Sequence, residues 1–137
     1  MDLRERVTAR LLQNGVRPTL QRVQIGMLVL DQPCHFSADQ LLARLRRGGQ
    51  RVAKATVYNT LSLFSCRGLI REIAVDPTRL MYDSTTTPHH HFYNAETGEL
   101  TEIDPAELQV SRLPALPSAT EAESVEILIR IRPSKGA

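Results

Sequence analysis

The chain has 137 residues, of which 42% are hydrophobic, and a formal net charge of +2. This length suits one compact domain or two small ones that share a core. No apolar run approaches the ~18 residues that a membrane-spanning helix needs, and no secretory signal opens the chain, so we expect a cytoplasmic protein. Two cysteines are too few for a disulfide framework or a C-x-x-C zinc clamp.

The small net charge hides a division along the chain. Residues 1–83 contain 13 Lys/Arg and 7 Asp/Glu, whereas residues 84–137 contain 4 and 8. The front half is therefore basic and the back half acidic, which suggests a polyanionic partner for the front half. Ordinary solvated charges would also explain this division, and charge alone does not decide between them.

Two helices are predicted first, over residues 2–14 and 19–30. Asp2 is a suitable N-cap, with Glu5 completing a capping-box pattern, and Thr19 is a suitable N-cap for the second helix. Gly15 and Pro33 provide stops. The apolar stripes at helical spacing are Leu3, Val7, Leu11 and Leu12 in the first helix and Leu20, Val23, Met27 and Leu30 in the second.

A third helix is predicted to begin after Ser37 and to end at Gly48-Gly49. Gln40 is placed to complete a capping box with Ser37. The residues predicted to face inward are Leu41, Leu42 and Leu45. The pattern predicts an ordinary amphipathic helix with one buried face.

A fourth helix, predicted within residues 53–68, has an unusual polar face. Its buried stripe comprises Val57, Leu61 and Phe64, and its other face carries Lys54, Thr56, Tyr58, Asn59 and Ser62. No acidic residue occurs between Asp39 and Glu72. Such a face suits a DNA major groove, where Asn reads adenine and hydroxyls contact phosphates. For this helix alone, a merely polar surface is an equally good interpretation.

Residues 69–83 are predicted to form a hairpin with its turn at residues 76–78. Helices followed by a two-stranded wing are typical of a winged helix-turn-helix, and this order of elements strengthens the DNA-binding hypothesis. Arg71 and Arg79 lie on the wing, where they are placed to contact phosphates.

Beyond a linker at residues 84–88, the pattern predicts two short strands, within residues 89–95 and 98–104. A short helix is predicted at residues 105–113, and residues 125–132 alternate like a half-buried strand. Three strands and one helix form too thin a core to stand alone. We therefore expect a homodimer, which would present two recognition helices to a palindromic operator.

Three of the four histidines are adjacent, at positions 89–91. Neutral imidazole is a common ligand of borderline metals and of haem iron. A lone histidine would suggest a polar loop, but three in a row before a strand favour a metal or haem site. On a strand, His89 and His91 would face one side and His90 the other.

The chain resembles the ferric uptake regulator superfamily over nearly its whole length. The matching stretches are GVRPTLQRVQI, HFSADQLLARL, KATVYNTLSLF, GLI, MYD, HHHFY and GELTEI. Within the superfamily, Asn59 after TVY and the HHHFY segment most resemble the iron-response regulators of alphaproteobacteria. The resemblance implies an α+β protein with a winged-helix DNA-binding domain (1–84), a hinge (85–88) and a small α/β dimerisation and sensing domain (89–137).

The resemblance also implies a hinge metal site. The ligands carried over by position are His35, Asp83, His91 and Glu102, with His89 on the same strand face as His91. Asp83 stands where relatives usually have Glu. This donor set suits iron, manganese or zinc. A four-cysteine structural zinc is excluded because Asn94 and Thr97 occupy a usual C-x-x-C position.

The iron-response branch implies that haem binds the run, through His89, His90 or His91, and that haem or iron relieves DNA binding. The alternative is a metal-corepressed regulator of the same fold, because the sequence does not give the sign of the coupling. We expect no enzyme, since the chain has no activated nucleophile and no H-E-x-x-H motif. A ribosomal-RNA-binding protein would leave the histidines unexplained.

For DNA contacts, Tyr58 and Asn59 are predicted to read base edges. Asn59 replaces the arginine usual in relatives, which should favour adenine over guanine. The residues predicted to surround them are Lys54 and Thr56 at the start of the helix and Arg17, Arg22 and Arg51 on phosphates. Both Cys34 and Cys66 are expected to be buried.

Overall fold

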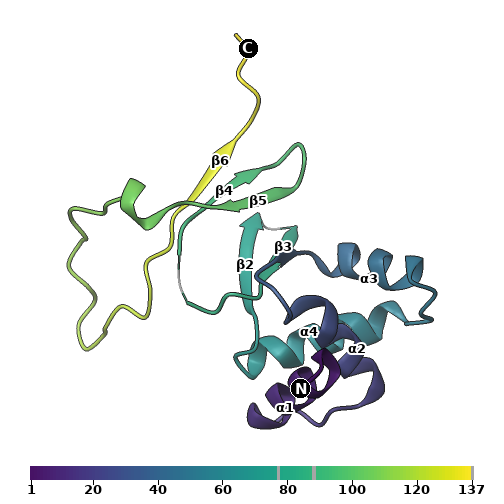
Figure 1. Cartoon of the computed structure of the whole chain (residues 1–137). Helices are drawn as coiled ribbons and strands as arrows, with labels where there is room; N and C mark the ends of the chain where they lie inside the picture. The colour runs from purple at the N-terminus through teal and green to yellow at the C-terminus, as the bar shows by residue number, and fades with distance from the viewer. Residues whose placement is uncertain (77, 88, 137) are drawn as a thin grey trace. The chain divides into compact units, whose positions relative to one another are not determined.

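The computed structural model describes residues 1–76, 78–87 and 89–136. The chain forms two compact units, Met1–Thr86 and Thr87–Ala137, and each is described by itself below (Figure 1). The α+β fold class is confirmed, with a winged helix-turn-helix in the first unit. Pro77, in the predicted turn, and Pro88, in the predicted hinge, lie outside the described residues.

The first helix, α1 (Leu3–Gln13), is capped as predicted, since Asp2 Oδ1 accepts a hydrogen bond from the Glu5 amide at 2.8 Å. Val7 and Leu11 are buried. Leu12 was wrongly predicted to be buried and is 61% exposed. One residue along a helix turns the side chain by about 100°, which takes Leu12 off the stripe formed by Val7 and Leu11.

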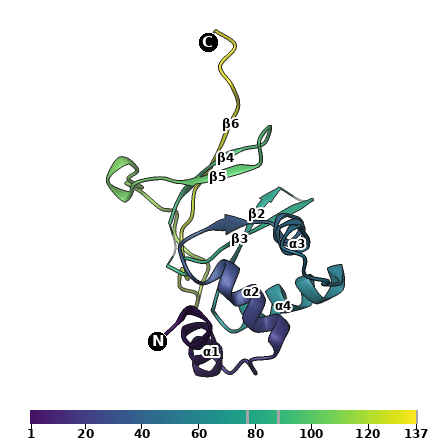
Figure 2. The same ribbon diagram turned by 45° about the vertical axis from the view of Figure 1, so that its right-hand side comes forward.

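The second helix, α2 (Leu20–Val29), packs against α1 and contacts α4 (Figure 2). Thr19 caps it, as predicted. The predicted stripe was wrong at Leu20, which is 63% exposed in the first turn. Contacts on two sides bury a wider set than one stripe, comprising Val23, Ile25, Gly26 and Val29.

The third helix, α3 (Ala38–Arg47), begins with the predicted capping box. Ser37 Oγ accepts from the Gln40 amide at 3.1 Å, and Gln40 Oε1 accepts from the Ser37 amide at 2.9 Å. The three predicted inward-facing leucines are buried, which confirms that face: Leu41, Leu42 and Leu45.

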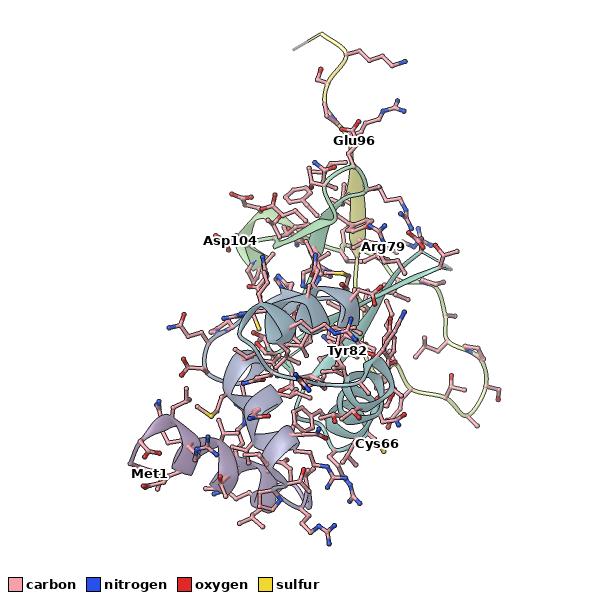
Figure 3. All side chains as sticks on the ribbon, turned by 90° about the vertical axis from the view of Figure 1, so that its right-hand side faces the viewer. Met1, Cys66, Arg79, Tyr82, Glu96 and Asp104 are labelled. Atoms are coloured by element: carbon pink, nitrogen blue, oxygen red, sulfur yellow. The ribbon has the colours of Figure 1, made fainter. Side chains whose placement is uncertain are left out.

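The fourth helix, α4 (Lys54–Cys66), buries its predicted stripe completely, with Val57, Leu61 and Phe64 all at 0% exposure. The prediction for Cys66 was wrong. Cys66 is exposed in the last turn of the helix, as Figure 3 shows. It lies two residues after Phe64, which turns it about 200° away from the buried stripe.

The wing is a hairpin of β2 (Arg71–Asp76) and β3 (Arg79–Asp83), as predicted. A third strand was not predicted: β1 (His35–Phe36) pairs antiparallel with β3, giving the sheet order β1-β3-β2. Phe36 stacks on Tyr82 with ring centroids 5.6 Å apart. This short strand ties the start of α3 to the end of the wing.

In the second unit, β4 (His91–Asn94) pairs antiparallel with β5 (Glu99–Glu102), which confirms the two predicted strands. The strand β6 (Leu128–Ile131) lies parallel to β4 on its other edge, so that the order is β5-β4-β6. Between β5 and β6 the chain makes a long excursion away from the sheet (Figure 1).

The helix predicted at residues 105–113 is a single 3-10 turn, Pro105–Glu107. Leu108 already has extended backbone angles, and Val110 and Leu113 are 40% and 52% exposed. A helix this short needs a packed apolar face, and Leu113 also precedes a proline, which disfavours helical geometry. The apolar pattern therefore does not become a helix here.

The alternation over residues 125–132 yields a strand only at Leu128–Ile131, and this strand is not half-buried within the chain. Ile129 and Ile131 are 37% and 41% exposed. None of the helices in the described parts of the chain is long and apolar enough to cross a membrane.

Candidate metal centre and nucleic-acid interface

His35 and Asp83 meet within the first unit. They are direct partners in the β1–β3 register, and His35 Nε2 lies 3.3 Å from Asp83 Oδ2. Asp83 is completely buried, and its other oxygen, Oδ1, accepts from the Thr85 amide at 2.8 Å. That bond orients Oδ2 toward the imidazole. The pairing depends on β1, the strand that the sequence pattern did not reveal.

Three further candidate ligands meet within the second unit. His91 and Glu102 are direct partners in the β4–β5 register, and His89 stands just before β4. His89 Nε2 lies 3.0 Å from Glu102 Oε1, and the His89 and His91 ring centroids are 4.4 Å apart. One ligand atom from each of the three lies within 4.8 Å of the others.

The hydrogen bonds of His89 define its tautomer. Its Nδ1 lies 2.7 Å from the Thr87 carbonyl oxygen, which can only accept, so Nδ1 carries the proton. In the neutral ring Nε2 then carries the lone pair, and it faces a carboxylate oxygen of Glu102. Two acceptors 3.0 Å apart require a cation to relieve their repulsion, either a proton on the ring or a metal ion.

These donors fit a divalent transition metal. Imidazole nitrogens with carboxylate oxygens suit iron, manganese or zinc. A carbonyl that fixes the far nitrogen of a histidine is also the usual outer partner of a metal ligand. Neither group of residues offers a thiolate in place of these ligands.

His90 is turned away from this group. Its Nδ1 accepts a hydrogen bond from the Ile127 amide at 2.8 Å, and its carbonyl accepts from the Ile103 amide at 2.9 Å. An Nδ1 that accepts requires the proton on Nε2 in the neutral ring. Binding an iron atom through Nε2 would move that proton and break the bond to Ile127.

Cys34, next to His35, is half-buried rather than fully buried. Burial raises the pKa of its thiol, and a hydrogen bond with Ser84 opposes this only in part. The thiol Sγ lies 3.5 Å from the Val29 carbonyl oxygen. Cys34 therefore rests as the neutral thiol at neutral pH.

The predicted DNA-reading face of α4 is accessible. Lys54, Tyr58, Asn59 and Ser62 are exposed, and Thr56 is partly exposed. The N-cap residue Ala53 makes no side-chain cap bond, so no capping side chain of this residue competes with a phosphate for the positive end of the α4 dipole.

The predicted phosphate contacts also reach the surface. Arg17 and Arg51 are exposed and Arg22 is partly exposed, with its Nη1 donating to the Arg17 carbonyl at 3.0 Å. Arg79 stands at the tip of the wing (Figure 3). All of these cationic groups belong to the first unit.

Comparison with known proteins places the chain. The profile of the ferric uptake regulator family matches residues 13–128. The chain belongs to this family. It is 33% identical over 103 residues to the ferric uptake regulation protein of Pseudomonas putida. The matched residues make up 74% of this chain and 77% of the relative. It is also 28% identical over 110 residues to the peroxide-responsive repressor PerR of Staphylococcus aureus (strain USA300), covering 80% and 74% of the two chains.

A solved structure of the ferric uptake regulator from Pseudomonas aeruginosa with manganese aligns with a TM-score of 0.69 at 26% identity, over 93% of this chain and 98% of that one. Proteins of the ferric uptake regulator family are DNA-binding, metal-responsive transcription regulators and not enzymes. The prediction that this chain is no enzyme is therefore confirmed.

Proposed function

We propose that the protein is a homodimeric regulator whose operator binding is controlled by a divalent iron, manganese or zinc ion. The proposed ligands are His35, Asp83, His89, His91 and Glu102. The observation that carries the proposal is that His89 Nε2 lies 3.0 Å from Glu102 Oε1, with the opposite ring nitrogen 2.7 Å from the Thr87 carbonyl oxygen.

We infer that one ion takes ligands from both units. Two donors in the first unit and three in the second are each fewer than the four to six that these ions prefer. Five residues separate Asp83 from His89, and six backbone steps span at most about 20 Å. The chain itself therefore keeps the second group within reach of the first.

An ion shared in this way would restrict the motion of the winged helix relative to the C-terminal unit. In a homodimer, that restriction fixes the separation of the two α4 helices. Fixing it before DNA arrives lowers the entropic cost of binding a palindromic operator. We therefore propose that metal tightens operator binding. The exposed Ile129 and Ile131 on β6 support a second copy of the chain as the partner.

The alternative from the iron-response resemblance is that haem binds the run and relieves DNA binding. The hydrogen bond from the Ile127 amide to His90 Nδ1 opposes that role for His90. His89 is likewise directed at a carboxylate. These bonds support a divalent ion over haem as the effector. We propose that the protein acts in the cytoplasm, where its operator would be found.

The test begins by enriching binding sequences from a random duplex library with the metal-loaded full-length protein. Fluorescence anisotropy then measures the affinity for the enriched duplex without metal, with Mn(II), with Zn(II) and with haem. We expect Mn(II) or Zn(II) to tighten binding and haem to leave it unchanged. Loosening by haem, with no metal effect, would instead support the iron-response alternative.

Two variants test whether His35 and His91 are ligands of the metal ion. His35→Ala and His91→Ala should each abolish the metal effect and lower the metal content measured on the purified protein. His90→Asn is the matched control, because the Asn Oδ1 can still accept from the Ile127 amide. One ion per chain, lost in both alanine variants, supports the shared site. An ion that survives His35→Ala with unchanged affinity would refute it.

A further inference from the structure

The reading face of α4 includes one carboxylate from another helix. Tyr58 Oη donates a hydrogen bond to Asp39 Oδ1 at 3.1 Å. Lys54 Nζ lies 3.8 Å from the same oxygen and 5.6 Å from the centroid of the Tyr58 ring. Lys54 and Tyr58 are one turn apart on α4, whereas Asp39 belongs to the first turn of α3. The three groups form a closed triangle.

The position of Asp39 in α3 is firmly determined. The residue lies inside the capping box that joins Ser37 to Gln40 through two hydrogen bonds. The carboxylate is therefore presented to α4 from a helix start that is closed by two hydrogen bonds. Asp39 is the last acidic residue before a long basic stretch, because residues 40–71 contain seven Lys/Arg and no Asp/Glu.

The ion pair between Asp39 and Lys54 adds little stability beyond the favourable position of the carboxylate in the first turn of α3. The Asp39 and Lys54 side chains are 70% and 63% exposed, and an ion pair so open to solvent contributes little to folding. On a surface that must approach phosphates, a negative charge also weakens binding to every duplex. A role in recognition explains why the group faces Tyr58.

The hydrogen bond determines how Tyr58 can interact with a base. A phenol has one proton to donate, and Tyr58 gives it to Asp39. Toward the groove the oxygen then acts only as an acceptor. The partners that suit an acceptor in the major groove are the amino groups of adenine and cytosine, whereas guanine and thymine present acceptors at the corresponding edge.

We propose that Asp39 is a positioning residue for sequence recognition. It fixes Tyr58 as an acceptor that selects an adenine or cytosine amino group. It also holds Lys54 in an ion pair, and this restraint weakens binding to random duplex. The inference rests on the proposed function, because it requires that α4 enter the major groove of an operator.

Two substitutions separate the charge from the hydrogen bond. Asp39→Asn removes the charge but keeps an oxygen that accepts from Tyr58, whereas Asp39→Ala removes both. Releasing Lys54 to one more phosphate should steepen the salt dependence by about 0.9 and tighten random-duplex binding about 5-fold at 0.15 M salt in both variants. Only Asp39→Ala should lose preference at one base pair, by roughly 5- to 100-fold.

Asp31→Asn is the matched charge control, since Asp31 is also in an exposed ion pair, with Arg6 at 3.7 Å. It should change neither binding nor preference. Tyr58→Phe should lose preference at the same base pair, and adding Asp39→Ala to it should cause no further loss. A residue needed only for the first turn of α3 would lower the melting temperature and leave the enriched sequence unchanged.

The experiment repeats the library enrichment with each metal-loaded full-length variant and measures affinities for the enriched and a random duplex. An Asp39→Ala variant that enriches the wild-type sequence with undiminished preference would overturn the inference and leave the proposed function intact. A wild-type protein that enriches no sequence would refute both.

Discussion

Gly26 allows a prediction in which one substitution changes stability in opposite directions in two backgrounds. A Cβ atom at Gly26 would lie 2.6 Å from Val7 Cγ1, across the packing of α2 on α1. Carbon atoms prefer about 3.5–4.0 Å. Val7 is 3% exposed, and a valine in a helix has one strongly preferred rotamer, so Val7 cannot turn aside and the helices must separate.

The magnitude follows from two opposing effects. Overpacking in a core costs about 1–3 kcal/mol, and so short a contact belongs in the upper part of that range. Replacing glycine by alanine raises the free energy of unfolding by about 1 kcal/mol, because alanine has the higher helix propensity. Gly26→Ala should therefore lower the free energy of unfolding by about 1–2 kcal/mol, or the melting temperature by ~4–8 °C for each kcal/mol.

Val7→Ala removes the methyl group that causes the clash. In that background, Gly26→Ala should raise the free energy of unfolding by about 1 kcal/mol, because only the propensity effect remains. Urea unfolding followed by circular dichroism measures all four proteins. Gly48→Ala is the control, since its Cβ would meet Leu45 O at an ordinary 3.4 Å. If Gly26→Ala stabilises the wild-type protein, the proposed close packing of α1 and α2 is wrong.

Three further predictions concern the first unit. Ser37→Ala should lower its stability by ~1 kcal/mol through loss of the capping box with Gln40, measured by thermal unfolding; an unchanged melting temperature would contradict the role of the box. Cys66, which is exposed, should react with iodoacetamide at pH 7 well before Cys34, whose raised pKa leaves little thiolate; mass spectrometry of the two peptides gives the order, and faster labelling of Cys34 would refute it. Asn59→Ala should reduce discrimination by about 1–3 kcal/mol at one base step, read from anisotropy on single-base variants of the enriched duplex, and an equal effect on every sequence would exclude base recognition.

The features that sequence patterns predicted well are those set by local interactions. The caps of α1, α2 and α3 involve residues three apart, and such short-range hydrogen bonds form wherever the helix forms. The buried stripe of α4 follows from helical period alone. The separation of His90 from its two neighbours followed from the alternation of an extended chain, even though only His91 belongs to β4.

Several of the failures originate in contacts between residues that are distant in the sequence. The strand β1 has two residues, and only pairing with β3, almost fifty residues further on, makes it a strand. Leu20 is apolar but 63% exposed, since no element among the described residues packs over it, whereas Leu12 lies off the buried stripe because of its position in the helical period. The segment after Glu107 has helical spacing, but its apolar side chains Val110 and Leu113 remain 40% and 52% exposed in the part of the chain that the structure describes. The tautomer of His89 depends on the Thr87 carbonyl, which no spacing rule could specify.

The parallel pairing of β6 with β4 has a consequence for how the chain folds. His91 pairs with Leu128, and the Ile127 amide reaches His90 over a separation of 37 residues. Closing so long a loop is slow compared with forming the local helices of the first unit. During synthesis, the winged helix can therefore be complete while β4 still has an open edge. Of the histidine run, His90 gains its hydrogen bond from the Ile127 amide only when β6 arrives, whereas the β4–β5 pairing that sets His91 opposite Glu102 involves residues close in sequence and can form earlier.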